Sequence, residues 1–461
     1  FTPGQETILT CAGESYRVFT LQTPGELRGF AQLVNGGNDF SGRTVKLGAD
    51  IDVSNDTWTP IASTSKTPFK GTFDGAGKKI TYQIEECDKA DMALFGYLDG
   101  AELKNLTAAG RNSAKTASNI KGTAGLCASA ANSRITGCIN EVELLQGGKK
   151  VAGIAGTATN SVIKNCVNKA DITGTSAAGI VAGIVGDSTG NIVGKCTYIR
   201  DCRNEGRITG SKAGGIVGNY ASNSALEEPA VENCRNLGTV ASGMNVGGIA
   251  GSFTGWMRNC ENTAEIDGNG KNVVGGIVGY LPGSSSAEIR IEKCRNSGDV
   301  YGIPIAGGIA GKTNSIKNSK IQIVNCENTG NVQTKKTGGA TGASSGGIIG
   351  ESSFPTAAAQ TGAALYVQGC ISYAEENLQL NAVGKLYSND NNLKSNPTRK
   401  YEAVYALAEE GEDLVYDGTE PLAVNADSFK KSKMTVKLNK AGGENFWGYD
   451  AKARYPLFGK F

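Results

Sequence analysis

Two short signatures return along most of the chain, and together they leave few folds open to it. The first is Gly-Gly-Ile-Val-Gly or a close variant, which occurs seven times between Ala152–Gly156 and Gly346–Gly350. The second follows 10 to 20 residues later, reads Asn-Cys-x-Asn-x-Gly-x-Val, and is centred on Cys138, Cys166, Cys202, Cys234, Cys260, Cys294, Cys326 and Cys370. The intervals between these cysteines run from 26 to 44 residues, which is typical of the turns of a solenoid.

Within each repeat the side chains alternate with the period of a β-strand. From Cys166 to Ile172, small or apolar residues alternate with more polar ones. An apolar residue three positions before each cysteine, such as Ile163 or Ile291, predicts a second strand. Short strands in turns of about 33 residues predict an all-β fold, a right-handed parallel β-helix in which each turn pairs with the next at about 4.8 Å.

Stacked turns place equivalent side chains in columns. An Asn two residues after the cysteine recurs in seven of the eight turns, and its amides are predicted to bond along the column and to tolerate a left-handed bend. Leu106 takes the cysteine position in an earlier turn, which predicts buried, reduced thiols. The predicted structural ladders are Cys138, Cys166, Cys202, Cys234, Cys260, Cys294 and Cys326, with Asn168, Asn204, Asn236, Asn262, Asn296 and Asn328.

Charged residues beside the cysteines alternate in sign from turn to turn. Arg200, Glu232, Arg258 and Glu292 lie two positions before the cysteines, and a similar series follows one position after them. Neighbours one strand spacing apart avoid like charges in this way, so we interpret both series as structural ladders. A charged stripe that binds a ligand is the alternative.

The ends of the chain differ from the repeats. Thr23-Pro24-Gly25-Glu26 is a capping box with Pro at the first helical position, and it predicts an amphipathic helix that covers the open N-terminal end of the solenoid. In the tail, Tyr401–Glu410 and Asp427–Asn439 are predicted helices. We therefore expect an N-terminal cap over residues 1–42, a parallel β-helix over 43–385 and a C-terminal capping region over 386–461.

The motifs resemble those of a known family. Phe-Lys-Gly-Thr-Phe-Asp-Gly-Ala-Gly-Lys-Lys-Ile at Phe69–Ile80 and the two recurring signatures are similar to GLUG-motif surface proteins over roughly residues 20–375. The resemblance implies a secreted bacterial protein at the cell surface, often adhesin-like and sometimes a non-catalytic region beside an IgA-protease-like metallopeptidase domain. Phe1 is not an initiator Met and no signal-like segment follows it, so we expect a signal peptide and an anchor outside this chain.

The residue inventory limits the chemistry. The 461 residues include no histidine, which excludes His-based zinc sites, Ser-His-Asp triads and Cys-His dyads. Twelve cysteines occur without a Cys-x-x-Cys pair. Four of them lie outside the column and their disulfide state is left open, with a local Cys196–Cys202 bridge as one alternative: Cys11, Cys87, Cys127 and Cys196.

Two groups of charged residues are candidates for a site on the scaffold. Asp50, Asp52 and Asp56 form one group, and Arg200 with Asp201 forms the other. Paired carboxylates are typical of glycan-cleaving enzymes, and oxygen ligands also suit a structural calcium ion. Such residues are more often members of a solvated turn or a ladder, so we predict no catalytic residues and no cofactor.

The leading functional hypothesis is a non-catalytic surface module that acts as an adhesin or structural spacer. The alternative is a carbohydrate-active enzyme or a carbohydrate-binding module. A net charge of +2 without a basic run argues against a nucleic-acid partner. The chain has no stretch of 18 apolar residues, which argues against direct insertion into a membrane. The expected partner of this monomer is a glycan or protein on a host or bacterial surface.

Variation in turn length predicts where a partner binds. The extra residues all fall between the glycine signature and the cysteine, so the inserted loops are expected along one edge of the solenoid. Loops on a rigid scaffold are common recognition sites. The candidate contact residues are Tyr220, Tyr280, Leu281, Phe354 and Pro355.

Overall fold

The structure is a computed structural model that carries side chains. It describes residues 18–87, 91–114, 122–147, 149–174, 180–189, 195–222, 224–268, 272–285, 287–334, 344–354, 362–373, 383–388, 398–407, 415–416, 420–421, 423–424, 432–444, 446–448 and 457–459. The predicted loop residue Pro355 and the cysteine Cys11 lie outside these ranges.

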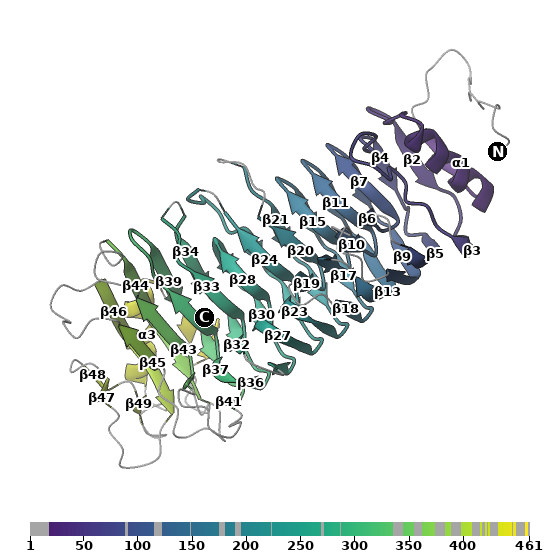
Figure 1. Cartoon of the computed structure of the whole chain (residues 1–461). Coiled ribbons are helices and arrows are strands. Elements are labelled where there is room, and N and C mark those ends of the chain that lie inside the picture. Colours follow the sequence, from purple (N-terminus) through teal and green to yellow (C-terminus); the bar gives the residue numbers. More distant parts are fainter. Residues whose placement is uncertain are drawn as a thin grey trace. The chain divides into compact units, whose positions relative to one another are not determined.

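The chain is nearly all β-structure, and parallel strands form a β-solenoid, as the repeats predicted. Two short helices, α1 (Pro24–Asn35) and α3 (Ser432–Gly442), accompany the strands in the described residues. The chain divides into two compact units, Phe1–Ser211 with Ile216–Gly218, and Lys212–Gly215 with Asn219–Phe461. In each unit the strands of successive turns lie side by side (Figure 1).

In the first unit, one column of strands runs from turn to turn with parallel pairing throughout. Its members are β1 (Val18–Leu21), β2 (Thr44–Leu47), β4 (Thr72–Asp74), β8 (Glu102–Lys104), β12 (Arg134–Thr136), β16 (Val162–Lys164) and β21 (Tyr198–Arg200). A second sheet stacks β7 (Phe95–Asp99), β11 (Cys127–Ala131), β15 (Ala155–Thr159) and β20 (Val185–Ser188). Apolar side chains such as Ile135 and Ile163 are fully buried between the strands.

The predicted N-terminal helix is confirmed. Thr23 accepts a hydrogen bond from the backbone of Glu26, whose side chain accepts one from Thr23 N–H, so the capping box is complete. The helix lies at the β1–β2 end of the unit (Figure 1). It packs the buried ring of Phe30 at centroid distances of 5.0 Å from Phe40 and 5.8 Å from Phe69.

The second unit repeats the same arrangement. Its column consists of β25 (Val231–Glu232), β29 (Trp256–Arg258), β34 (Ile289–Glu292), β39 (Lys320–Val324), β44 (Ala364–Ser372) and β46 (Thr398–Leu407). Its other sheet stacks β28 (Ala250–Thr254), β33 (Val278–Pro282), β38 (Ala310–Asn314), β43 (Ile349–Phe354) and β45 (Val383–Ser388). All these pairings are parallel.

One predicted helix is wrong. Tyr401–Glu410 was expected to be helical, but Thr398–Leu407 forms β46, which pairs with β44 from Ala364↔Thr398 to Ser372↔Ala406. Hydrogen bonds to a neighbouring strand satisfy the backbone there and override the local helix propensity. Parallel stacking therefore continues into the segment assigned above to the C-terminal capping region.

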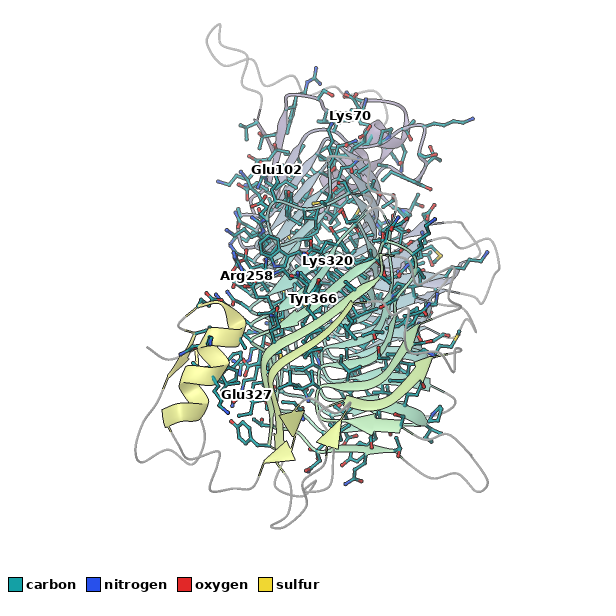
Figure 2. The ribbon with its side chains drawn as sticks, turned by 90° about the vertical axis from the view of Figure 1, so that its left-hand side faces the viewer. Lys70, Glu102, Arg258, Lys320, Glu327 and Tyr366 are labelled. Carbon is teal, nitrogen blue, oxygen red and sulfur yellow. The ribbon has the colours of Figure 1, made fainter. Side chains whose placement is uncertain are left out.

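Helix α3 overlaps the other predicted helix and lies against the side of β44 and β46. It buries Leu438, and the residues after it contact the corners of three turns. Lys293 Nζ lies 2.9 Å from Glu444 Oε2, Asn325 Nδ2 donates to Glu444 Oε1 at 3.2 Å, and Trp447 Nε1 donates to the carbonyl of Gly369 at 3.1 Å. Figure 2 shows this helix beside the strands.

Candidate functional site

The predicted asparagine column is a continuous chain of amide hydrogen bonds in each unit. In the first unit Asn140 Nδ2 donates to Asn168 Oδ1, and Asn168 Nδ2 to Asn204 Oδ1, both at 2.7 Å. In the second unit the same bond, again at 2.7 Å, links Asn236, Asn262, Asn296 and Asn328. All of these asparagines are fully buried, and the second column ends where Asn328 Nδ2 donates to Ser372 Oγ at 3.1 Å.

A glycine lies directly opposite six of the ladder amides. A Cβ added to the second glycine of the glycine signature would lie 1.7 to 2.4 Å from the amide group of the ladder asparagine, which is too close for any side chain. The pairs are Gly125 with Asn140, Gly153 with Asn168, Gly215 with Asn236, Gly248 with Asn262, Gly276 with Asn296, and Gly308 with Asn328. The two sequence signatures are therefore two sides of one contact.

The left-handed bend does not occur at the ladder asparagine, contrary to our expectation. It occurs at the residue just before the cysteine position, where φ lies between 50° and 54°. The bent residues are Asn105, Asn165, Asp201, Asn233, Asn259, Lys293 and Asn325. Asn and Asp adopt this conformation more readily than other residues with a side chain.

The cysteine column is buried as predicted. All eight column cysteines are free thiols with no exposed surface, and Cys166 Sγ donates to the carbonyl of Lys164 at 3.3 Å. Burial, reinforced by neighbouring thiols, raises the pKa of Cys138, Cys260 and Cys326 well above the ordinary value. A thiol with a raised pKa holds little of the reactive thiolate, so these positions are inert.

Cysteines outside the column are free as well where the structure describes them. Cys127 and Cys196 are buried free thiols, so the Cys196–Cys202 bridge is absent. Burial raises the pKa of Cys127 to about 12. The Cys87 side chain lies outside the described part of the structure.

The alternating charges pair between neighbouring turns. Arg258 Nε donates to Glu232 Oε1 at 2.8 Å, and Arg235 Nε lies 3.1 Å from Glu261 Oε2. These partly exposed pairs are worth about 0–1 kcal/mol each. They are arranged as the ladder interpretation requires.

Glu327 ends one of these charge series and is the most buried acid in it. Its side chain is only 1% exposed, lies 2.7 Å from Arg295 Nε and accepts a hydrogen bond from the hydroxyl of Tyr373 at 2.6 Å. Burial raises the pKa of Glu327, and the charge of Arg295 opposes this shift only in part.

The predicted loop residues are less accessible than expected. Tyr220 on β24 (Val217–Ala221) is 1% exposed and stacks on Phe253 at 5.2 Å, and Leu281 is fully buried. The prediction that they are displayed is wrong, because strand alternation turns both side chains into the core. Tyr280 is half-buried and points to the outside of β33. The side chain of Phe354, like Pro355, lies outside the described residues.

The candidate carboxylates have separate structural partners. Asp50 accepts from the backbone of Lys79 at 2.9 Å, Asp52 from Ser54 N and Oγ at 2.9 and 2.6 Å, and Asp56 lies 3.2 Å from Arg28. Among the described residues no three of His, Cys, Asp and Glu are grouped as a metal site requires.

Both residues of the second candidate group contact neighbouring side chains. Asp201 lies 3.5 Å from Lys164, and the guanidinium carbon of Arg200 lies 4.5 Å from the centroid of the Tyr198 ring.

One outward column of the second unit combines aromatic and hydrogen-bonding side chains. Trp256, Arg290, Gln322 and Tyr366 occupy the same register on β29, β34, β39 and β44, and each is half-buried. Sequence reasoning did not connect them, although each lies four residues before the column cysteine of its own turn. That common offset is the signal that identifies the column.

Comparison with known proteins adds little to this description. No family model and no curated protein matches the chain. Among solved structures, it is similar to the "putative immunoglobulin A1 protease" from Bacteroides ovatus, with 16% identity and a TM-score of 0.34 over 95% of this chain and 91% of that one. In the described residues, no helix is both long and apolar enough to cross a membrane.

Proposed function

We propose that the chain is a non-catalytic β-solenoid module of a secreted bacterial surface protein, in which it acts as a spacer and adhesin. The resemblance of its repeats to GLUG-motif surface proteins supports the location. The β-solenoid itself supports the spacer role, because each turn adds the same backbone pairing as the turn before it.

The observation that carries this proposal is the pairing of acids with bases between turns. A glycan-cleaving enzyme needs two carboxylates on either side of the scissile bond, and a proton-abstracting enzyme needs a base within reach of its substrate. Here Glu232, Glu261 and Glu327 each face an arginine from a neighbouring turn. Pairing of this kind supports a structural role for these acids over attack on a substrate.

A carbohydrate-binding module on the same scaffold is the second candidate. The column of Trp256, Arg290, Gln322 and Tyr366 favours it, because aromatic rings beside hydrogen-bonding groups suit a sugar. The two candidates are compatible, since an adhesin needs a surface that binds.

The proposal is tested by measuring both adhesion and cleavage with the full chain. Purified protein should adhere to bacterial or host cells and should release no product from a panel of polysaccharides and peptides, measured as new reducing ends, unsaturated uronates or free amines. Product release that the Glu327→Gln or Glu292→Gln substitution abolishes would refute the non-catalytic assignment.

A further inference from the structure

We propose that Trp256, Arg290, Gln322 and Tyr366 form a binding platform for a neutral, linear oligosaccharide. The inference rests on the proposed adhesin function and deepens it, since it names the surface and the class of ligand. The four residues lie on consecutive turns of the second unit and share one register.

The platform has the dimensions of an extended ligand. Its residues follow the direct register Trp256↔Arg290, Arg290↔Gln322 and Gln322↔Tyr366. Three strand spacings separate the two aromatic residues, which amounts to about 14 Å. A chain of sugar rings laid across the strands meets one side chain per strand, in a regular series.

Neighbouring side chains hold the Trp256 ring in place, and a cation lies near the Tyr366 ring. Trp256 Nε1 donates to Glu292 Oε2 at 3.1 Å, and the guanidinium carbons of Arg290 and Arg258 lie 4.9 and 5.6 Å from the Trp256 ring centroid. Lys320 Nζ lies 6.0 Å from the centroid of Tyr366, beside which it lies in Figure 2. A fixed ring offers flat apolar surface to the C–H groups of a sugar and loses little entropy on binding.

Hydrogen-bonding groups lie between and beside the rings. Among the described residues, no partner engages the Gln322 side-chain amide or the Tyr366 hydroxyl, although both side chains are half-buried. An amide supplies two donors and an acceptor, and a phenol supplies one of each. Sugar hydroxyls both donate and accept, so they match these groups.

Among the side chains that the structure describes, each cation beside the platform has a carboxylate close by. The pairs are Arg258 with Glu232, Arg290 with Glu292 at 3.2 Å, and Lys320 with Glu288 at 3.1 Å. These cations are therefore neutralised before a phosphate or carboxylate ligand arrives, which disfavours nucleic acid and anionic glycans. A regular series of polar side chains favours a repeating polymer over a protein partner, whose contacts concentrate in a central hot spot.

The experiment measures binding of the full chain to an array of neutral linear gluco-, xylo-, manno- and galacto-oligosaccharides of two to six rings, beside sulfated and uronic-acid chains. We expect at least one neutral series to bind, with affinity that rises with length and is unchanged between 0.05 and 0.5 M NaCl. Trp256→Ala and Tyr366→Ala should each weaken binding about tenfold or more.

Two further variants keep the test independent of folding defects. Gln322→Ala removes an amide that has no partner in the described structure, so it should weaken binding about threefold without changing the melting temperature. Tyr301→Ala removes a half-buried tyrosine from β36 (Val300–Gly302), outside the platform, and should leave affinity unchanged.

The outcomes separate this inference from the proposed function. Absence of binding to every neutral oligosaccharide, binding confined to anionic chains, or equal effects of Trp256→Ala and Tyr301→Ala would each overturn the platform. If the protein still adheres to cells in those cases, its adhesin function stands on another surface. Cleavage of a bound chain would overturn the non-catalytic function and leave the location of the platform intact.

Discussion

At the scale of single residues, the contact between a glycine and a ladder asparagine explains why two signatures recur together. Gly276 has no room for a side chain, because a Cβ there would lie 2.1 Å from the carbonyl oxygen of Gly308 and 2.3 Å from Cγ of Asn296. The fully buried Asn296 amide in turn bonds to Asn328 and to the carbonyl of Gly298. Loss of the glycine or of the asparagine leaves buried polar groups without hydrogen-bond partners.

Gly276→Ala should therefore destabilise the protein by about 1–3 kcal/mol or more, through overpacking against a rigid backbone. Gly243→Ala is the matched control, because nothing lies within 4 Å of the added Cβ, and its effect should stay within about 0.5 kcal/mol. Urea unfolding followed by circular dichroism compares the two. Equal stability of both variants would contradict the close packing.

Sequence reasoning found the buried amide column but misplaced the bend. Several turns carry one asparagine just before the cysteine and another two residues after it, as at Asn259 and Asn262. Alternation indicates which of the two faces inward, but it carries no information on backbone φ. The bend at Asn259 follows from the corner that the chain turns there.

Glu327 should make stability depend on pH. Its folded-state pKa is raised above the ordinary 4.5 by burial, so protonation favours the folded state. The resulting stabilisation is complete below pH 4.5 and is lost as the pH rises through the folded-state pKa. Wild-type protein should thus lose stability relative to Glu327→Gln over that window.

Thermal unfolding of both proteins between pH 4 and pH 8 measures this difference. Glu261→Gln, which removes the less buried acid of the same charge series, controls for the loss of one charge. If the wild type instead gains stability relative to Glu327→Gln as the pH rises, the charge of Arg295 lowers the pKa of Glu327 by more than burial raises it.

At the scale of elements, segments that carry a sequence signature were predictable from the sequence, and segments without a signature were not. The strands around each cysteine carry both signatures, and the capping box at Thr23 marks α1 directly. Strand β46 lacks a cysteine and a glycine signature, so nothing in its residues indicated stacking, and its pairing with β44 decides its conformation.

The thiol column predicts the reactivity of the whole set of cysteines. Ten described cysteines are buried and free, so at most two of the twelve thiols should react with a disulfide reagent in the native protein. All twelve should react in denaturant without reductant. Recovery of only a few thiols under those conditions would mean that the column is oxidised.

At the scale of the whole molecule, the candidate site depends on register that a sequence does not display. Trp256 and Tyr366 are 110 positions apart in the chain, yet they lie three strand spacings apart in one column. Turn-length variation pointed instead to the loops, where strand alternation in fact buries Tyr220 and Leu281. Offsets counted from each cysteine locate the platform once the turns are known.

Substitutions of exposed residues in a long loop test whether the loop edge or the platform binds the ligand. Replacing Ala225 and Glu227 with Gly or Ser removes exposed side chains and keeps the length of the loop. We expect a change in unfolding free energy of less than about 0.5 kcal/mol and unchanged oligosaccharide binding. Loss of binding in this variant, with Trp256 intact, would place recognition on the loop edge.

The amide ladder also has an evolutionary consequence. Each internal ladder asparagine accepts one bond from the turn before and donates one to the turn after, with the same 2.7 Å geometry at every internal step of the second unit. Duplication or deletion of the DNA that encodes one turn therefore leaves every remaining amide paired. Selection can adjust the reach of such a protein by recombination, one turn at a time, without repairing its core.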